Sequence, residues 1–178
     1  MKVVKTKLKD CVVIEPKVFG DERGFFLETF QLSRYVEEAG ITLPFVQDNH
    51  SRSSKGVLRG LHFQKNKPQG KLVRVVKGEV YDIAVDIRPD SNTFGQWEGV
   101  ILSEENKKQL WVPSGFAHGF VVLTDVADFE YKCTDYYDPS DEGSILWSDP
   151  DLKIDWPILN PILSEKDSLA PCLKDIKS

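Results

Sequence analysis

The sequence predicts a mainly β domain, a sandwich or barrel of antiparallel strands with a few short helices. Short runs of β-branched and aromatic residues recur along the chain, turn signals separate them at regular intervals, and one segment has a clear helical period. With 178 residues, 40% of them apolar, the chain can bury a substantial core. It contains no repeat, low-complexity tract or linker, so we expect residues 1–178 to form a single domain.

The first part of the chain combines two β-type runs with the predicted helix. Residues 12–16 form a short run that ends at a proline, and a turn over 20–24 leads into an aromatic-rich strand over 25–30. Residues 31–39 carry apolar side chains at positions i, i+3, i+4 and i+7, which predicts a helix. Gly40 follows at the position of a C-terminal cap.

The rest of the chain is a series of short strands followed by a tail. The predicted strands span 45–51, 57–64, 71–76, 80–87, 97–102, 109–112, 118–123 and 129–136. From residue 139 onward the chain is rich in Asp, Pro and Ser. We expect this tail to wrap the sheets, with Trp147 and Trp156 as its anchors.

A first predicted hairpin turns at Lys77-Gly78. A two-residue turn there pairs Val73 with Asp82 and places Lys71 diagonal to Asp82 on the same face. The carboxylate would then position the ammonium.

A second predicted hairpin turns over residues 124–127. A four-residue loop there places Phe120 opposite Tyr131, with His118 diagonal to Tyr131 on the same face. Each hairpin therefore carries titratable residues on one face, which is typical of a ligand cavity inside a β-barrel.

The strand over 57–64 places charged residues where a core strand is expected. Strict alternation directs Arg59 and His62 to opposite faces. Gly60 lies between them, and a β-bulge at this glycine would bring both side chains to the same face. We treat the bulge as a hypothesis, which an Arg59 side chain on the outer, solvent-facing side would contradict.

Charge and cysteine content exclude several classes of protein. The net charge of −5 argues against a general nucleic-acid binder, because phosphate backbones require a basic face. The N-terminal residues lack the continuous apolar stretch of a signal peptide, and no segment approaches the length of a membrane span. The three cysteines, Cys11, Cys133 and Cys172, have no regular spacing, which favours reduced thiols in a cytoplasmic protein.

The three histidines give little support for a metal site. His50 is interpreted as a hydrogen-bonded core residue, which leaves His62 and His118 as inward candidates. A mononuclear site needs about three convergent ligands. Gln64 occupies the place of a second histidine near His62, and the lysine and arginine nearby would repel a cation. We therefore predict no metal.

Other polar residues have an ordinary structural interpretation when read alone. Asp167 fits a capping box with Ser164 as the N-cap. Glu142 lies in a turn and would be called solvated. The polar residues 47–49 lie within a strand, where they indicate either ligand hydrogen bonds or a sheet edge.

Several motifs in the same order resemble the dTDP-4-dehydrorhamnose 3,5-epimerase family over about residues 12–167. They are RGFF (23–26), RGLHFQ (59–64), QGKLVR (69–74), FGQW (94–97), WVPSGFAHGF (111–120), YKCTDYY (131–137) and IDWP (154–157). The resemblance implies a cupin-type jelly-roll barrel of antiparallel strands, a homodimer, and no metal or other cofactor. It also implies conversion of dTDP-4-dehydro-6-deoxy-D-glucose to dTDP-4-dehydro-L-rhamnose in dTDP-L-rhamnose synthesis.

Transferred residue by residue, the resemblance makes His62 the catalytic base, Asp167 its carboxylate partner and Tyr131 the proton donor. Tyr137 corresponds to the residue that stacks on thymine. The implied substrate contacts are Arg23, Glu28, Gln47, Asp48, Asn49, Arg59, Lys71, His118, Glu142 and Lys166.

The residue types suit this chemistry. C3 and C5 flank the C4 ketone, so a base can remove their protons to give an enolate. Inversion then requires an acid on the opposite face, and imidazole and phenol can fill the two roles. We expect Lys71, positioned by Asp82, to stabilise the enolate oxygen. Arg23, Arg59 and Lys166 are then available for the pyrophosphate.

Three alternatives stay open from the sequence. An epimerase that acts only at C3 shares the same barrel, a non-catalytic cupin-like module would bind the sugar nucleotide without proton exchange, and a cupin oxygenase would require a metal.

Overall fold

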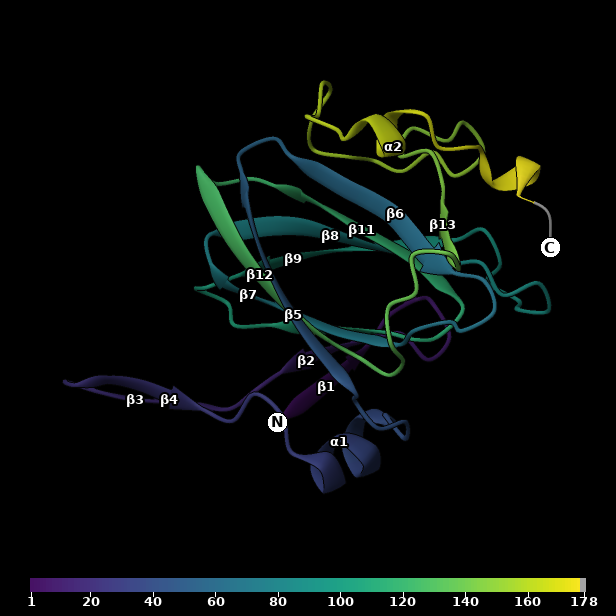
Figure 1. Ribbon diagram of the computed structural model, residues 1–178. Helices are drawn as coiled ribbons and strands as arrows, with labels where there is room; N and C mark the ends of the chain where they lie inside the picture. Colours follow the sequence, from purple (N-terminus) through teal and green to yellow (C-terminus); the bar gives the residue numbers. More distant parts are fainter. Residues whose placement is uncertain (177–178) are drawn as a thin grey trace.

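Two antiparallel β-sheets face each other in the structure, a computed structural model that describes residues 1–176 (Figure 1). The first sheet contains, in spatial order, β1 (Lys2–Lys5), β2 (Val12–Glu15), β10 (Gln109–Val112), β7 (Lys71–Lys77), β12 (Val126–Cys133) and β5 (Gln47–Ser54). The second contains β13 (Glu142–Ser144), β6 (Leu58–Gln64), β11 (Phe116–Val122), β8 (Glu79–Asp86) and β9 (Trp97–Ser103). The predicted mainly β fold is confirmed.

A separate hairpin and three short helices complete the described part of the chain. Strands β3 (Val18–Asp21) and β4 (Gly24–Leu27) form a two-stranded arm that projects from the body (Figure 1). The helices are α1 (Leu32–Ala39), α2 (Glu165–Ser168) and the 3₁₀-helix η1 (Leu173–Asp175). No helix in residues 1–176 is long and apolar enough to cross a membrane.

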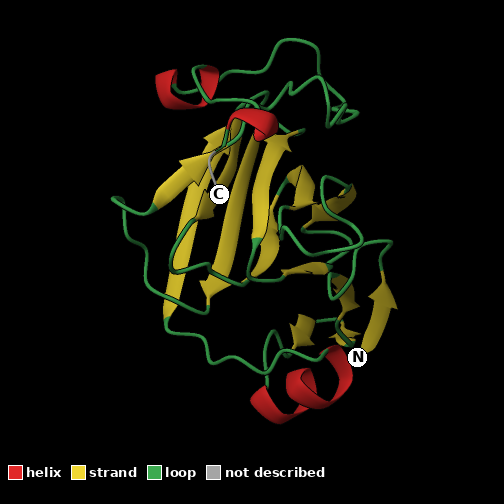
Figure 2. Ribbon diagram, turned by 90° about the vertical axis from the view of Figure 1, so that its right-hand side faces the viewer, coloured by secondary structure: helices red, strands yellow, loops and turns green. Residues whose placement is uncertain are grey.

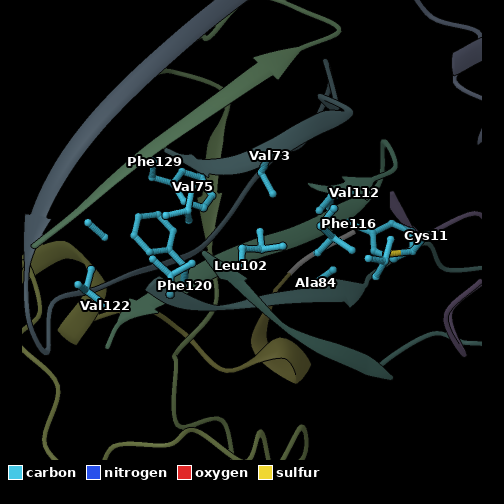
Figure 3. Packing of buried hydrophobic residues seen from close by; sticks show 14 of the residues in the cluster. Cys11, Val73, Val75, Ala84, Leu102, Val112, Phe116, Phe120, Val122 and Phe129 are labelled. Atoms are coloured by element: carbon cyan, nitrogen blue, oxygen red, sulfur yellow. The ribbon is translucent and has the colours of Figure 1, made fainter. Parts of the chain in front are cut away.

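The core fills the space between the two sheets (Figure 3). Val75 and Phe129 come from the first sheet and Phe120 and Val122 from the second, and all four are at most 5% exposed. The rings of Phe120 and Phe129 stack across the interface with centroids 4.2 Å apart. Because side chains alternate along each strand, the same inward faces can carry polar residues farther along.

The C-terminal tail covers the outer face of the second sheet (Figures 1 and 2). Trp156 is 8% exposed and packs in a cluster with Leu61, Ile83 and Ile145. Its indole Nε1–H donates to the carbonyl of Trp147 at 2.8 Å. Trp147 packs against the same cluster, so both tryptophans hold the tail on the second sheet, and the tail's position brings α2 next to β6.

Helix α1 packs on the opposite side of the molecule, against the first sheet (Figures 1 and 2). The Gln31 side chain caps its N-terminus by accepting from the Arg34 N–H at 2.7 Å. Gly40 ends it with a φ of +70°, in the left-handed conformation that glycine adopts at little cost. The predicted helix and its cap are confirmed, whereas the strand expected over 25–30 already ends at Leu27.

The predicted hairpin at Lys77-Gly78 is wrong. Strand β7 lies between β10 and β12, and β8 lies between β11 and β9, so the chain crosses from one sheet to the other at Gly78. Val73 pairs with Tyr131 and Leu110, not with Asp82. Both strands bury apolar faces, and those faces meet across the core between the sheets.

The predicted hairpin over 124–127 is wrong for the same reason. Strand β11 belongs to the second sheet and β12 to the first. Phe120 therefore pairs with Asp82 and Arg59 in its own sheet and meets β12 across the core. Alternation of apolar residues identifies an inward face, but it does not say which neighbour lies beside a strand and which lies opposite.

Candidate active site

A β-bulge in β6 brings Arg59 and His62 to one face. His118 of β11 pairs with His62 and Phe120 pairs with Arg59, so the β6 segment contains one residue more than its partner. Gly60 has a φ of +113°, and a Cβ there would lie 2.6 Å from the His118 carbonyl oxygen. The hypothesis of a bulge at this glycine is confirmed. Arg59 lines the interior cavity and donates to Ser53 Oγ at 2.9 Å.

Two adjoining cavities open between the sheets. The inner one, of about 150 Å³, includes Arg59 and His118 in its wall, and the outer one, of about 170 Å³, includes Tyr137 and Glu142. His62, Lys71 and Tyr131 line both. Three of the four residues predicted to be catalytic therefore meet at one place, with His62 from the second sheet and Lys71 and Tyr131 from the first.

Asp167 reaches His62 from the tail. The His62 Nε2 atom lies 2.6 Å from Asp167 Oδ1, and Asp167 is 3% exposed. The Asp167 N–H also donates to Ser164 Oγ at 3.1 Å, so the predicted cap is present as well. Burial acts to raise the pKa of Asp167, but the hydrogen bond and charge of His62 outweigh it and hold the pKa below its ordinary value. The group is thus a carboxylate that accepts from His62.

This pairing determines which imidazole nitrogen can act as a base. When Nε2–H donates to Asp167, a neutral His62 has its lone pair on Nδ1. Nδ1 lies 3.9 Å from Glu142 Oε1, beyond hydrogen-bond distance. A carboxylate at one ring nitrogen fixes the tautomer and leaves the other nitrogen free to accept a proton.

Lys71 presents an ammonium to both cavities. In the described residues it has no hydrogen-bond or ion-pair partner within the protein. Burial lowers its pKa, and the nearby Cys133, Glu142 and Asp82 oppose this effect. A partly desolvated cation without a partner can bind a negatively charged oxygen of a ligand strongly.

The expected pair between Lys71 and Asp82 is wrong, because their strands lie in opposite sheets. Asp82 is fully buried, and both of its carboxylate oxygens lie 3.0 Å from His118 Nε2. His118 is thus held by a carboxylate on the neighbouring strand. The sequence did not indicate this role of Asp82.

Tyr131 stands on the wall opposite His62. It lies on β12, and burial raises the pKa of its phenol, so the hydroxyl keeps its proton at neutral pH. The inner cavity is lined by His118, Phe120 and Tyr131, as expected, although the hairpin from which we predicted this is wrong.

Glu142 joins two groups at the mouth of the outer cavity. Its Oε2 accepts from the Tyr137 hydroxyl at 2.9 Å and lies 2.5 Å from Lys166 Nζ. Its side chain is 13% exposed, so the interpretation of Glu142 as a solvated turn residue is wrong. Burial acts to raise the pKa of Glu142, but Lys166 and Tyr137 outweigh it and the pKa is lowered.

Gln64 was missed as a supporting residue. Its amide donates to the carbonyls of Lys67 and Tyr136 and accepts from the Asp138 N–H at 2.8 Å, which fixes the loop that carries Tyr137. The signal available in the sequence is a glutamine two residues after His62 on the same predicted strand.

Some predicted site residues lie away from the two cavities. Arg23 is at the tip of the β3–β4 arm and pairs with Asp21, and Glu28 pairs with Arg34. Asp48 points to the outer face, where it accepts from Lys132 at 3.0 Å. Its neighbours Gln47 and Asn49 do line the outer cavity.

His50 is not the core residue that was expected. Its side chain is 54% exposed and its Nε2 lies 3.4 Å from Asp128 Oδ1 on the outer face of the first sheet. The three cysteines are free thiols, and residues 1–176 contain no group of three or more His, Cys, Asp or Glu residues arranged to hold a metal ion.

Comparisons with known proteins agree with this geometry. A family model described as dTDP-4-dehydrorhamnose 3,5-epimerase matches residues 5–175. The chain is 59% identical to the protein of that name from Salmonella typhimurium, covering 97% of this chain and 96% of the relative. The Pseudomonas aeruginosa relative is 54% identical, with 98% and 97% covered.

A solved structure extends the likeness to the fold. It is the dTDP-6-deoxy-D-glucose-3,5-epimerase from Legionella pneumophila in complex with dTDP-4-keto-L-rhamnose. Its sequence is 60% identical and the TM-score is 0.97, with 99% of this chain and 94% of that chain covered. The expected cupin-type jelly roll is confirmed by this neighbour. The chain belongs to the dTDP-4-dehydrorhamnose 3,5-epimerase family.

Proposed function

We propose that this protein is an isomerase that inverts C3 and C5 of dTDP-4-dehydro-6-deoxy-D-glucose to give dTDP-4-dehydro-L-rhamnose, in dTDP-L-rhamnose synthesis. The observation that carries the proposal is the placement of the His62–Asp167 pair and Tyr131 on opposite walls of one cavity. Family membership supports the same substrate and product.

The opposite walls match what inversion requires. His62 Nδ1 removes the proton from a carbon next to the ketone, and the electron pair moves into the enolate. Tyr131 then returns a proton to the other face of the same carbon. General acid–base catalysis of this kind contributes roughly 10²–10⁴-fold to a rate.

Lys71 stabilises the enolate oxygen. Lys71 lines both cavities together with the proposed base and acid, so its ammonium can approach the C4 oxygen. A fixed donor of this kind typically contributes about 2.7–4 kcal/mol. His118, held by Asp82, lies in the inner cavity as a further donor, and Arg59 and Lys166 bind the pyrophosphate.

The nucleotide binds at the outer cavity. Tyr137 is 51% exposed at its mouth, where its ring can stack on thymine. Gln47, Asn49 and Glu142 supply polar contacts from the same wall.

A homodimer accounts for the residues that lie outside the cavities. The β3–β4 arm exposes Phe19, Phe25 and Phe26 by 52%, 61% and 68%, and exposed aromatic clusters of this kind are typical of protein–protein contacts. Against a second copy, the arm would bury these rings and bring Arg23 and Glu28 to the other subunit's substrate. The enzyme acts in the cytoplasm, without a cofactor, on a free sugar nucleotide.

Proton exchange in deuterated water tests the proposal. The wild-type enzyme should place deuterium at both C3 and C5, as measured by NMR of the product. Deuterium at C3 alone would identify a C3 epimerase, and binding without exchange at either carbon would identify a non-catalytic module. Loss of activity on treatment with a chelator would indicate a metal enzyme.

The two tyrosines provide a second test. Tyr131→Phe should allow exchange but block inversion, because the proton must then return from the base that removed it. Tyr137→Phe should keep most activity, because a phenyl ring still stacks. Equal behaviour of the two variants would contradict the assignment.

A further inference from the structure

Inversion of two carbons by one base and one acid leaves both groups in the wrong protonation state after the first inversion. The inference below rests on the proposed function and concerns how these protonation states are restored. The first inversion moves a proton from carbon to His62 and another from Tyr131 to carbon. His62 is then an imidazolium and Tyr131 a phenolate. The second inversion needs a neutral imidazole and a phenol again, so His62 must lose a proton and Tyr131 must gain one before it starts.

One side of His62 is closed to proton release. Nε2 is bonded to Asp167 at 2.6 Å, and the Asp167 side chain is 5% exposed under the tail. A proton passed to this nearly buried carboxylate therefore has little access to water. With the sugar nucleotide in the cavities, a proton on Nε2 therefore has no ready path to solvent.

The other side faces Glu142. Nδ1 lies 3.9 Å from Glu142 Oε1, so a shift of about 1 Å brings the two atoms to hydrogen-bond distance. The second carboxylate oxygen, Oε2, already contacts Tyr137 and Lys166, whose side chains are at the exposed mouth. The carboxylate thus extends from the base to the rim of the cavity.

We propose that Glu142 takes the proton from His62 Nδ1 between the two inversions and releases it to water at the cavity mouth. The transfer breaks the Nδ1–H bond and forms a carboxyl O–H bond, which then breaks as the proton leaves to water. Tyr131 regains a proton from solvent, which balances the proton that Glu142 releases to solvent. The directions of the two pKa shifts agree, because the lowered pKa of Glu142 favours rapid release and the raised pKa of Tyr131 favours uptake.

Glu142→Gln tests the relay, because the amide keeps the size and hydrogen bonds of the side chain but cannot accept the proton. The first exchange should persist, while the second should slow by about 100-fold. NMR and mass spectrometry of the early product in deuterated water should then show one deuterium per sugar, where the wild-type product carries two.

Chemical rescue separates a relay from a structural role. Glu142→Ala should show the same excess of singly labelled product, and added formate should restore double labelling by supplying a mobile carboxylate. Glu130→Gln is the matched control: it makes the same change in a carboxylate that pairs with Arg74 and lines neither cavity, so the ratio of singly to doubly labelled product should not change.

The outcomes are distinct. The relay would be overturned if Glu142→Gln slowed exchange equally at both carbons and formate had no effect on Glu142→Ala. Glu142 would then be a binding residue. Absence of exchange in the wild-type enzyme would instead refute the proposed function itself.

Discussion

Two histidine–carboxylate pairs lie side by side on neighbouring strands of the second sheet, and their carboxylates come from different parts of the chain. His62 and His118 are register partners on β6 and β11, and each bonds a carboxylate through Nε2. Asp82 comes from the adjacent strand of the same sheet, whereas Asp167 comes from the tail. The His118 side chain is 8% exposed and that of His62 is 29% exposed.

The difference assigns separate roles to the two rings. His62 has a free nitrogen directed toward Glu142 and the mouth, so it can both take up and release a proton. His118 is enclosed between sheet strands with a fully buried carboxylate, an arrangement that suits a fixed hydrogen-bond donor. We therefore expect exchange with solvent, not the presence of a carboxylate partner, to distinguish the proposed base.

Replacing each histidine by alanine should separate the pairs most strongly. His62→Ala should lower deuterium exchange by about 10⁴-fold, because no other group in the cavity wall has the same position. His118→Ala should retain measurable exchange with weaker substrate binding. Exchange rates by NMR and dTDP affinity by calorimetry check both, and His62→Ala should still bind dTDP. Retained activity in His62→Ala would remove this residue from its role.

Replacement of the two carboxylates should give the next largest difference between the pairs. Asp167→Asn should reduce kcat by about 10²-fold or more, because the amide no longer selects the tautomer with a free Nδ1. Asp82→Asn should act mainly on stability, with a loss of about 1–3 kcal/mol for a disturbed buried hydrogen bond, and less on kcat. Steady-state kinetics and thermal denaturation of both variants measure the contrast; a reversal of the two effects would contradict the assignment.

A third prediction concerns the pH profile of kcat/KM. Burial lowers the pKa of Lys71 below its ordinary 10.5, and the cation is the active form, so activity should fall as pH rises through this lowered value. The raised pKa of Tyr131 places loss of the acid above pH 10.0. Lys71→Arg should move the alkaline limb upward, because arginine stays charged. If the alkaline limb of the pH profile did not move in Lys71→Arg, deprotonation of Lys71 would be excluded as the cause of the fall in activity.

The smallest effect is expected at the mouth. Tyr137→Phe removes the hydroxyl bonded to Glu142 but keeps the ring, so kcat/KM should fall by at most about tenfold, or about 1.4 kcal/mol. The loss should appear in KM. A large fall in kcat would show that the hydroxyl takes part in the chemistry near His62.

Local sequence signals predicted the elements well because each depends on nearby residues. The helical period located α1, Gly40 located its end, and Gly60 between two polar residues indicated the bulge. Strands β1, β3 and β13 were missed; β3 is exposed along its length and β13 has only three residues. Short strands of this kind carry little of the alternation that identifies a strand.

Sheet partners were not predictable in the same way. The turns after β7 and β11 look like hairpin turns, but whether two consecutive strands pair or face each other depends on the packing of the whole barrel. Asp167 shows a related limit, because its capping signal is real and says nothing of the histidine that it also binds. The family resemblance supplied that partner.

The origin of Asp167 in the tail has a consequence for chains of incomplete length. Strands β1 to β12 end at Cys133, whereas α2 begins only at Glu165. A chain that stops before α2 contains His62 and Tyr131 but lacks the carboxylate that selects the imidazole tautomer. A chain that stops before Trp156 also leaves the outer apolar face of the second sheet uncovered, because Trp156 packs there with Leu61 and Ile83. Orientation of the proposed base and burial of that face thus depend on the same late segment of the chain.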